Sequence, residues 1–119
     1  MRERRDAIAI PPWLLGRWTV DASRLDADRK LELGRGVIDI SLDGLAHHGF
    51  AKGAQIFDQR WSRPIASALE GGVVQLDCED FDELWLRVLE RDGDRLLVYL
   101  GGIDVLPWGR EMPLVKVSD

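Results

Sequence analysis

The chain has 119 residues, of which 45% are hydrophobic and 31% are charged, and these values are typical of one globular domain. Its formal net charge of -5 argues against nucleic-acid binding, because affinity for a phosphate backbone depends on Lys and Arg. No run approaches the ~20 consecutive apolar residues that cross a bilayer, so a membrane is not an expected partner either.

The cysteine content and the start of the chain favour a cytoplasmic protein. Cys78 is the only cysteine, so the chain cannot form the internal disulfide that commonly stabilises small secreted domains. Residues 1–12 are too polar for a signal peptide and end at Pro11-Pro12. Because proline resists both helix interiors and central strands, we expect residues 1–12 to form a flexible N-terminal arm and residues 13–119 to form the domain.

The first structural signals follow the two prolines. Residues 16–20 predict a strand with Trp18 and Val20 on one face, because strand side chains alternate with a period of two. Residues 21–33 are the best helix candidate, since Asp21 can accept hydrogen bonds from the N–H groups of a first turn. The apolar residues there form no long stripe, so one short helix of one or two turns is predicted.

Alternating strands then continue to the end of the sequence. Residues 37–50 and 83–100 each predict an antiparallel hairpin, with type I′ turns at Asp43-Gly44 and Asp92-Gly93. The further short strands are expected at residues 54–61, 65–69, 73–78 and 113–117. About eight short strands with turn signals every 8–12 residues favour an antiparallel up-and-down β-barrel, whose closure would leave no exposed edge.

The segment around Gly16-Arg17-Trp18 resembles the opening of lipocalin-like (calycin) domains, which begin with Gly-X-Trp on the first barrel strand. Small bacterial lipocalin-like domains of unknown function are the nearest comparison, and the later hairpin layout is also similar. The resemblance implies a barrel in which Gly16 allows close backbone packing and Trp18 closes one end, with a partner for its indole N–H. In lipocalins a late arginine packs over this tryptophan, and the candidates here are Arg87 and Arg110.

The residues that could carry chemistry form no convincing site. His47 and His48 are adjacent on a predicted strand and therefore point to opposite faces, which argues against a shared metal ion or a haem. The acidic stretch of residues 77–83 lacks the spacing of a calcium loop. Cys78 alternates with apolar residues and is expected in the core rather than as a nucleophile. We therefore predict no catalytic residue, metal or cofactor.

An enzyme remains a minor alternative, for which Asp39, Asp58 and His48 are the residues whose convergence would matter.

The leading functional hypothesis is a non-catalytic protein that holds a small apolar molecule in the barrel interior or mouth. The residues expected to line that site are Ile38, Ile40, Phe50, Phe57, Trp61, Leu86, Val98 and Tyr99.

The alternative is an acidic protein-interaction or inhibitor module. Five tryptophans in 119 residues exceed what one small core needs, and tryptophan is enriched at recognition surfaces. Exposed tryptophans and the acidic stretch of residues 77–83 would then contact a protein partner.

Overall fold

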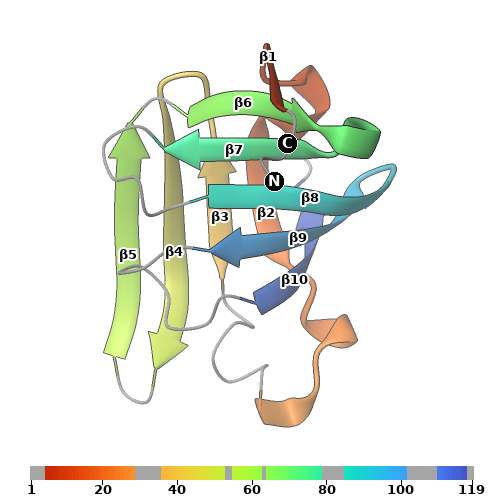
Figure 1. Cartoon of the computed structure of the whole chain (residues 1–119). Coiled ribbons are helices and arrows are strands. Elements are labelled where there is room, and N and C mark those ends of the chain that lie inside the picture. The colour runs from red at the N-terminus through yellow and green to blue at the C-terminus, as the bar shows by residue number, and fades with distance from the viewer. Residues whose placement is uncertain are drawn as a thin grey trace.

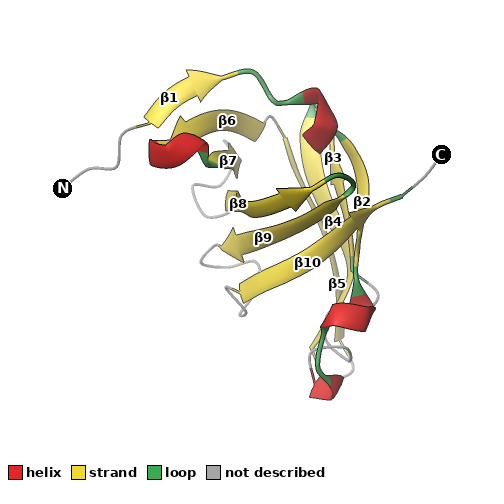
Figure 2. Cartoon of the chain, turned by 90° about the vertical axis from the view of Figure 1, so that its right-hand side faces the viewer, coloured by secondary structure: helices red, strands yellow, loops and turns green. Residues whose placement is uncertain are grey.

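The strands form one antiparallel sheet in the computed structural model, which describes residues 5–28, 36–52, 55–62, 64–78, 85–101 and 110–117. The strands are β1 (Arg5–Ile8), β2 (Gly16–Val20), β3 (Val37–Ile40), β4 (Gly44–Lys52), β5 (Gln55–Ser62), β6 (Pro64–Leu69), β7 (Val74–Cys78), β8 (Trp85–Asp92), β9 (Arg95–Gly101) and β10 (Arg110–Lys116). Short 3-10 turns at Pro12–Leu14, Ala22–Arg24 and Glu70–Gly72 connect some of them (Figure 2).

The nine strands β2 to β10 follow one another as a meander. The order across the described sheet is β1-β6-β7-β8-β9-β10-β2-β3-β4-β5, and every pair of neighbours is antiparallel. The first and last strands of the meander, β2 and β10, are paired, while the sheet is interrupted between β5 and β6. In Figure 1, β3, β4 and β5 stand upright and cross the group β6 to β9. The predicted antiparallel, sequential pairing is therefore confirmed.

Closure into a barrel is not seen in the described sheet. Strand β5 ends the sheet on one side, and β1 ends it on the other. Strand β1 pairs with the edge of β6 that a closed meander would give to β5. Strand β1 lies within residues 1–12, which were expected to form a flexible arm. Its four residues are too few to show an alternating pattern, so no strand was predicted there.

The core fills the concave side of this sheet. Alternate residues of the inner strands are buried, as the period of two predicts, and they form one contiguous cluster. Its members with 2% exposure or less are Leu14, Trp18, Ile38, Ile40, Leu45, Leu76, Leu86, Leu96, Val98, Leu100, Met112 and Leu114. Burial of each such side chain contributes roughly 1.5–3 kcal/mol before the entropy of ordering is counted. Cys78 is also buried here and is in no disulfide.

Two connections between strands differ from their predictions. In the predicted helix, Asp21 caps the first turn as expected, because its side chain accepts a hydrogen bond from the Ser23 N–H. That turn is a three-residue 3-10 helix, and residues 29–33 lie outside the described part. The first hairpin turns one residue earlier than predicted: Ser41 N–H bonds to the Gly44 carbonyl, so the central residues are Leu42 and Asp43.

The reason for this shift is a side-chain hydrogen bond. The Ser41 hydroxyl oxygen accepts the Gly44 N–H at 3.1 Å, and Gly44 is not among the glycines with positive φ, so no type I′ turn forms at Asp43-Gly44. The second hairpin also forms, but its turn lies one residue later than predicted: Asp92 pairs with Arg95, so the central residues are Gly93, with a φ of 58°, and Asp94.

One end of the sheet is held by Trp18. Its indole Nε1–H donates to the Leu14 carbonyl over 2.9 Å, which confirms the expected partner for a buried N–H. The basic residue over the ring is Lys116 on β10, with its Nζ 5.3 Å from the ring centroid. Lys116 Nζ also donates to the Trp13 carbonyl over 3.2 Å. Of the two candidate arginines, Arg87 contacts Trp85 instead, and the side chain of Arg110 lies outside the described part.

Gly16 makes this arrangement fit. Its φ of 122° is unfavourable for any residue with a side chain, and a Cβ there would lie 3.3 Å from Lys116 Cε. We predict that Gly16→Ala lowers the free energy of unfolding by ~1–3 kcal/mol, measured by urea denaturation.

The matched control is Gly93→Ala, where φ is 58° and nothing lies within 4 Å of the new Cβ. It carries only the backbone cost of ~1–2 kcal/mol. A loss at Gly16 that is smaller than the loss at Gly93 would contradict the close packing assigned to Lys116.

Candidate binding surface

Two aromatic rings and an arginine lie together on the outer face of β8 and β9. Because Leu86 and Val98 point into the core, Trp85, Arg87 and Tyr99 point to the opposite face. The rings of Trp85 and Tyr99 are stacked, with centroids 5.1 Å apart and an interplanar angle of 16°. The guanidinium carbon of Arg87 lies 5.4 Å from the Trp85 ring centroid, a cation–π contact.

A chain of hydrogen bonds orders the arginine. Arg87 Nε donates to Gln75 Oε1 over 2.8 Å, and Gln75 Nε2 donates to Asp77 Oδ1 over 3.1 Å. The first bond follows from the sheet register, because Gln75 faces Arg87 across β7 and β8, and the second from the alternation along β7, which puts Gln75 and Asp77 on one face. Gln75 is only 2% exposed although it lies on the outer face. We call these five residues, Gln75, Asp77, Trp85, Arg87 and Tyr99, the outer patch.

Gly101 fixes the position of the Trp85 ring. It is the cross-strand partner of Trp85 on β9, and a Cβ at Gly101 would lie 2.5 Å from two atoms of the indole. Real Cβ atoms do not approach this closely, so the ring can lie against the β9 backbone only because residue 101 has no side chain. The outer patch is therefore ordered by packing before any partner arrives.

Part of this patch was expected from the sequence. Trp85 is one of the five tryptophans considered for recognition, and Asp77 is the start of the acidic stretch; residues 79–84 lie outside the described part. Gln75 was not expected, because its alternation with apolar neighbours gives no sign of a bond to Arg87. Tyr99 was expected in one interior site with Val98, although adjacent strand residues point to opposite faces.

The predicted lining residues are distributed as follows. Ile38, Ile40, Leu86 and Val98 lie on the inner face with 0–2% exposure, packed within the core cluster. Tyr99 lies on the outer face, in contact with Trp85. Phe50 and Phe57 are cross-strand partners on β4 and β5, and Trp61 faces Leu45. The side chains of those three aromatic residues lie outside the described part.

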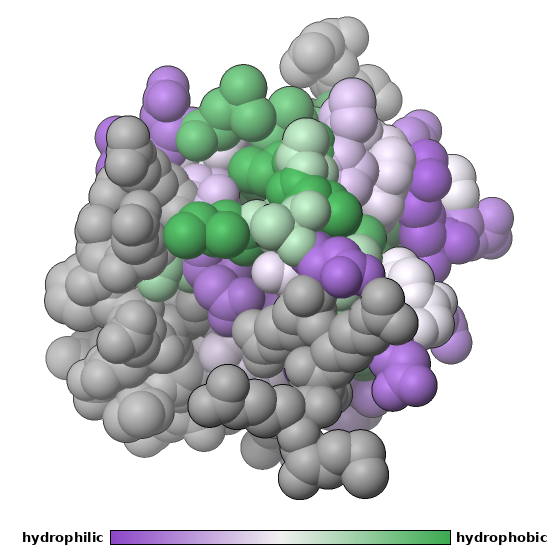
Figure 3. All heavy atoms as spheres, turned by 45° about the horizontal axis from the view of Figure 1, so that its top comes forward, coloured by the Kyte–Doolittle hydropathy of each residue, from purple (hydrophilic) through white to green (hydrophobic). Residues whose placement is uncertain are grey.

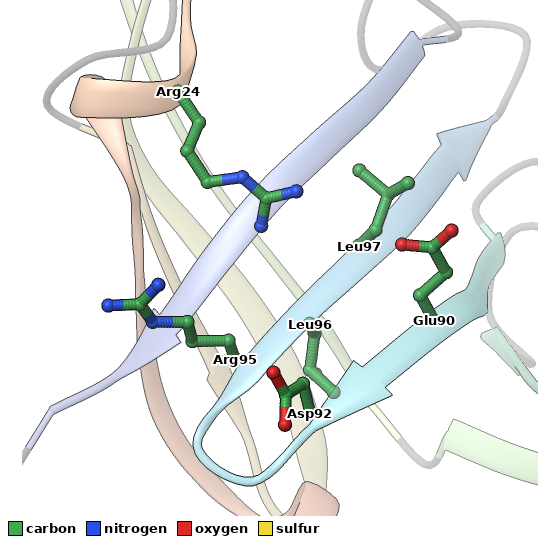
Figure 4. Close-up of a pocket in the computed structure, with 6 residues that line it drawn as sticks. All are labelled: Arg24, Glu90, Asp92, Arg95, Leu96 and Leu97. Atoms are coloured by element: carbon green, nitrogen blue, oxygen red, sulfur yellow. The ribbon is translucent and has the colours of Figure 1, made fainter.

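The described surface also carries shallow depressions. One, of about 210 Å³, is lined by Arg24, Glu90, Asp92, Arg95, Leu96 and Leu97 (Figure 4). Its charged side chains carry both signs and all four are exposed, so it offers no strong field for an ion of either sign. Another, of about 310 Å³, borders Trp13, whose ring lies 4.2 Å from the Arg91 guanidinium carbon. Neither depression contains a predicted lining residue.

A second polar group lies on the outer face of β2, β3 and β4. Arg17 donates to both carboxylate oxygens of Asp39, through Nε over 2.7 Å and through its terminal nitrogen over 3.0 Å. His48 Nε2 lies 3.4 Å from Asp39 Oδ2. These hydrogen bonds from Arg17, with its charge and that of His48, hold the pKa of Asp39 below its ordinary value.

Two of the three residues singled out for a catalytic convergence, Asp39 and His48, thus do meet. The side chain of Asp58, the third, lies outside the described part. Because Arg17 and Asp39 are direct cross-strand partners on β2 and β3, the group is interpreted as a cross-strand ion pair. His47 is fully buried while His48 is half-exposed, as expected for adjacent strand residues. Among the described residues no three metal-ligating side chains cluster.

Comparisons with protein-family models, with curated proteins and with solved structures gave no match for this chain. In the described part of the chain, no helix is long and apolar enough to span a bilayer.

The Arg17–Asp39 contact makes a pH-dependent contribution to stability. Because the folded pKa of Asp39 lies below its unfolded value of ~3.9, the contribution is present above about pH 4 and is lost as the pH falls through the folded pKa. Both side chains are partly solvated, with 59% and 31% exposure, so screening by solvent keeps the effect small.

We therefore predict that Asp39→Asn destabilises the fold slightly at pH 7, and by less at about pH 2.5, in urea unfolding at both pH values. An equal destabilisation at the two pH values would show that the carboxylate charge is not what matters.

Proposed function

We propose that this chain is a non-catalytic binding module whose outer patch contacts a protein partner. The observation that carries the proposal is the ordered, half-buried group of Trp85, Tyr99 and Arg87 on the outer face of the sheet. Trp, Tyr and Arg are the residue types most enriched among the side chains that dominate protein–protein affinity. Rings and guanidinium that are already ordered lose little entropy on binding.

The surroundings of the patch indicate the character of the partner. Ile65 on β6 is 49% exposed and faces Asp77 across β6 and β7, which extends the patch with an apolar contact. The acidic stretch of residues 77–83 begins beside it, and the whole chain carries a net charge of -5. A partner with an apolar centre and a basic rim would be complementary to this surface, and its approach would be accelerated by the opposite charge. The buried thiol of Cys78, which is in no disulfide, suits a cytoplasmic setting for this encounter.

The test begins with capture of a partner from the native host by the immobilised chain. The affinity of the purified pair is then measured by calorimetry for the parent chain and for Arg87→Ala, Trp85→Ala and Gly101→Ala. We predict at least a tenfold loss for Arg87→Ala and Trp85→Ala, since side chains of this kind contribute ~1.4 kcal/mol or more at the centre of an interface. Gly101→Ala keeps every patch residue but displaces the ring, and should weaken binding as well.

Arg17→Ala is the matched control, because Arg17 is also an outer-face arginine hydrogen-bonded across strands, but on β2. It should leave the affinity unchanged, whereas reversing Asp80 and Asp82 to lysine should weaken it. Full affinity in both Trp85→Ala and Arg87→Ala would remove the outer patch from the interface.

A second candidate function is carriage of a small apolar molecule by a lipocalin-like barrel. One observation favours it: Gly16, Trp18 and Lys116 lie at one end of the sheet much as the glycine, tryptophan and late basic residue are expected to lie in that family, with lysine in place of arginine. The described inner faces of β8, β9 and β10 are filled by side chains. This proposal therefore places the molecule toward β4 and β5, beside Phe50, Phe57 and Trp61.

Tryptophan fluorescence distinguishes the two functions. Under the carrier hypothesis, titration with a panel of fatty acids, retinoids and aromatic compounds gives a saturable change that Phe57→Ala weakens and Trp85→Ala leaves in place. The absence of saturation with every compound would reject carriage without affecting the outer-patch proposal.

A further inference from the structure

The depression of about 310 Å³ beside Trp13 lies at one end of the sheet, outside the filled core. Two further segments border it, the turn Glu70–Gly72 with the two valines that follow it, and the part of β8 from Val88 to Arg91. This end is the right-hand side of Figure 1 and faces the viewer in Figure 2. We call it the Trp13 depression. Its volume is at the lower end of the range of sites for small molecules, ~300–1,000 Å³.

An irregularity in β8 directs Arg91 toward this depression. Strand β8 has one more residue than β9 between Val88 and Glu90, which is a β-bulge. Beyond the bulge Arg91 is paired with Leu96, whose side chain is only 1% exposed in the core, and directly opposed strand residues share a face. Strict alternation from the buried Val88 would instead place Arg91 on the outer face. The bulge therefore turns this one arginine toward the side of the core, where Trp13 lies.

The contact between Arg91 and Trp13 holds a positive charge in place. The guanidinium carbon lies 4.2 Å from the centroid of the Trp13 ring, and Trp13 itself packs against the core cluster. A cation–π contact uses none of the N–H donors of an arginine, so the contact leaves them available to the paired oxygens of a carboxylate. Lys116 adds a second positive charge beside Trp13, since its Nζ donates to the Trp13 carbonyl over 3.2 Å.

The acidic neighbours of Arg91 face a different depression. Glu90 and Asp92 line the one of about 210 Å³, and Figure 4 shows the Glu90 carboxylate beside Leu97. Glu90 borders both depressions, but its pairing with Leu97 places its side chain on the outer face. The charged group that the described residues present to the Trp13 depression is therefore the Arg91 guanidinium, although the whole chain carries a net charge of -5.

The rest of the lining is apolar or bare backbone. Val73 and Val74 are half-buried, and Leu89 is 37% exposed. Gly71 and Gly72 have φ of 81° and 80°, and nothing lies within 4 Å of the position of a Cβ at either residue. An apolar ligand can thus lie against the valines, the leucine and the glycine backbone without displacing a side chain.

We propose that the Trp13 depression binds a small apolar carboxylate. Arg91 pairs with the carboxylate through its N–H donors, and the apolar body of the ligand lies on Trp13 and Leu89. Charge complementarity selects an acid over an uncharged compound, and the volume matches a small molecule. The depression contains no residue of the outer patch and none of the aromatic residues on β4 and β5, so the inference is independent of both functions proposed above.

Uncharged analogues are the necessary comparison, because apolar surface is exposed elsewhere on the chain. Ile8 on β1 is 37% exposed and Ile65 on β6 is 49% exposed. Figure 3, which brings the top of Figure 1 forward, shows hydrophobic residues gathered near the middle of the view. Adhesion to such surface does not distinguish a carboxylate from its amide, whereas a guanidinium does.

The test is a nuclear magnetic resonance titration of the isotope-labelled chain with phenylacetate and with cyclohexanecarboxylate, each compared with its neutral amide. We expect at least one acid to give saturable shifts of the Trp13 indole N–H and of the Gly71 and Gly72 amides. Its affinity should exceed that of its amide at least tenfold, because the pairing with Arg91 is charge-assisted. The absence of saturable shifts at these signals with both acids at millimolar concentration, or equal affinities for acid and amide, would overturn the proposal.

Two arginine variants then locate the charge. Arg91→Met keeps the length of the side chain and removes the guanidinium, so the affinity for the acid should fall at least tenfold, to that of the amide. Arg95→Met is the matched control, because Arg95 is an exposed arginine of the same hairpin that lines the other depression. It should leave both affinities unchanged. Equal losses in the two variants would show that positive charge at this end attracts acids without the Trp13 depression, and would also overturn the proposal.

Discussion

The pairing of β2 with β10 is the constraint on which the rest of the structure depends. It joins the first and last strands of the meander, with Val20 facing Leu114 and Trp18 facing Lys116. Without it, β2 to β5 and β6 to β10 would be two separate sheets, each with an uncovered apolar face. The indole of Trp18 anchors this junction, since its burial and its bond to Leu14 tie the N-terminal turn to β2, while Lys116 ties the same turn to β10 through the Trp13 carbonyl. Loss of a buried tryptophan typically costs ~3–5 kcal/mol.

The inner and outer faces of the sheet then take different roles. Along β8 and β9, the side chains of Leu86, Val98 and Leu100 point inward and pack in the core. Among the described residues, they leave no space for a ligand on that side. Their outward neighbours carry the aromatic rings and the arginine. Because the inner packing fixes the backbone of β8 and β9, it also fixes the spacing at which Trp85 stacks on Tyr99. A rigid core thus produces an ordered recognition surface on its reverse side.

The alternation of apolar residues with a period of two predicted most of the strands. Apolar alternation located β2, β3, β7, β8 and β9 to within one or two residues, because each buries one face and exposes the other. Strand β1 was not predicted because all its described side chains are exposed, so its sequence shows no buried face. The position of the turn after Ser41 was not predicted because a side-chain hydrogen bond, rather than the glycine, determines which residues turn. Barrel closure was inferred from strand count, and strand count alone does not specify which edges meet.

The candidate site was less predictable than the fold for a similar reason. The outer patch depends on neighbours across strands: Gln75 opposite Arg87, and Gly101 opposite Trp85. These pairs are 12 and 16 positions apart. The hairpin between β8 and β9 was predicted, but the register shift between Val88 and Glu90 that brings Gly101 opposite Trp85 was not. Nuclear Overhauser contacts between β2 and β10 test the central claim most directly. The account predicts cross-strand contacts linking Val20 with Leu114 and Thr19 with Val115; contacts of β10 with a strand other than β2 and β9 would contradict it.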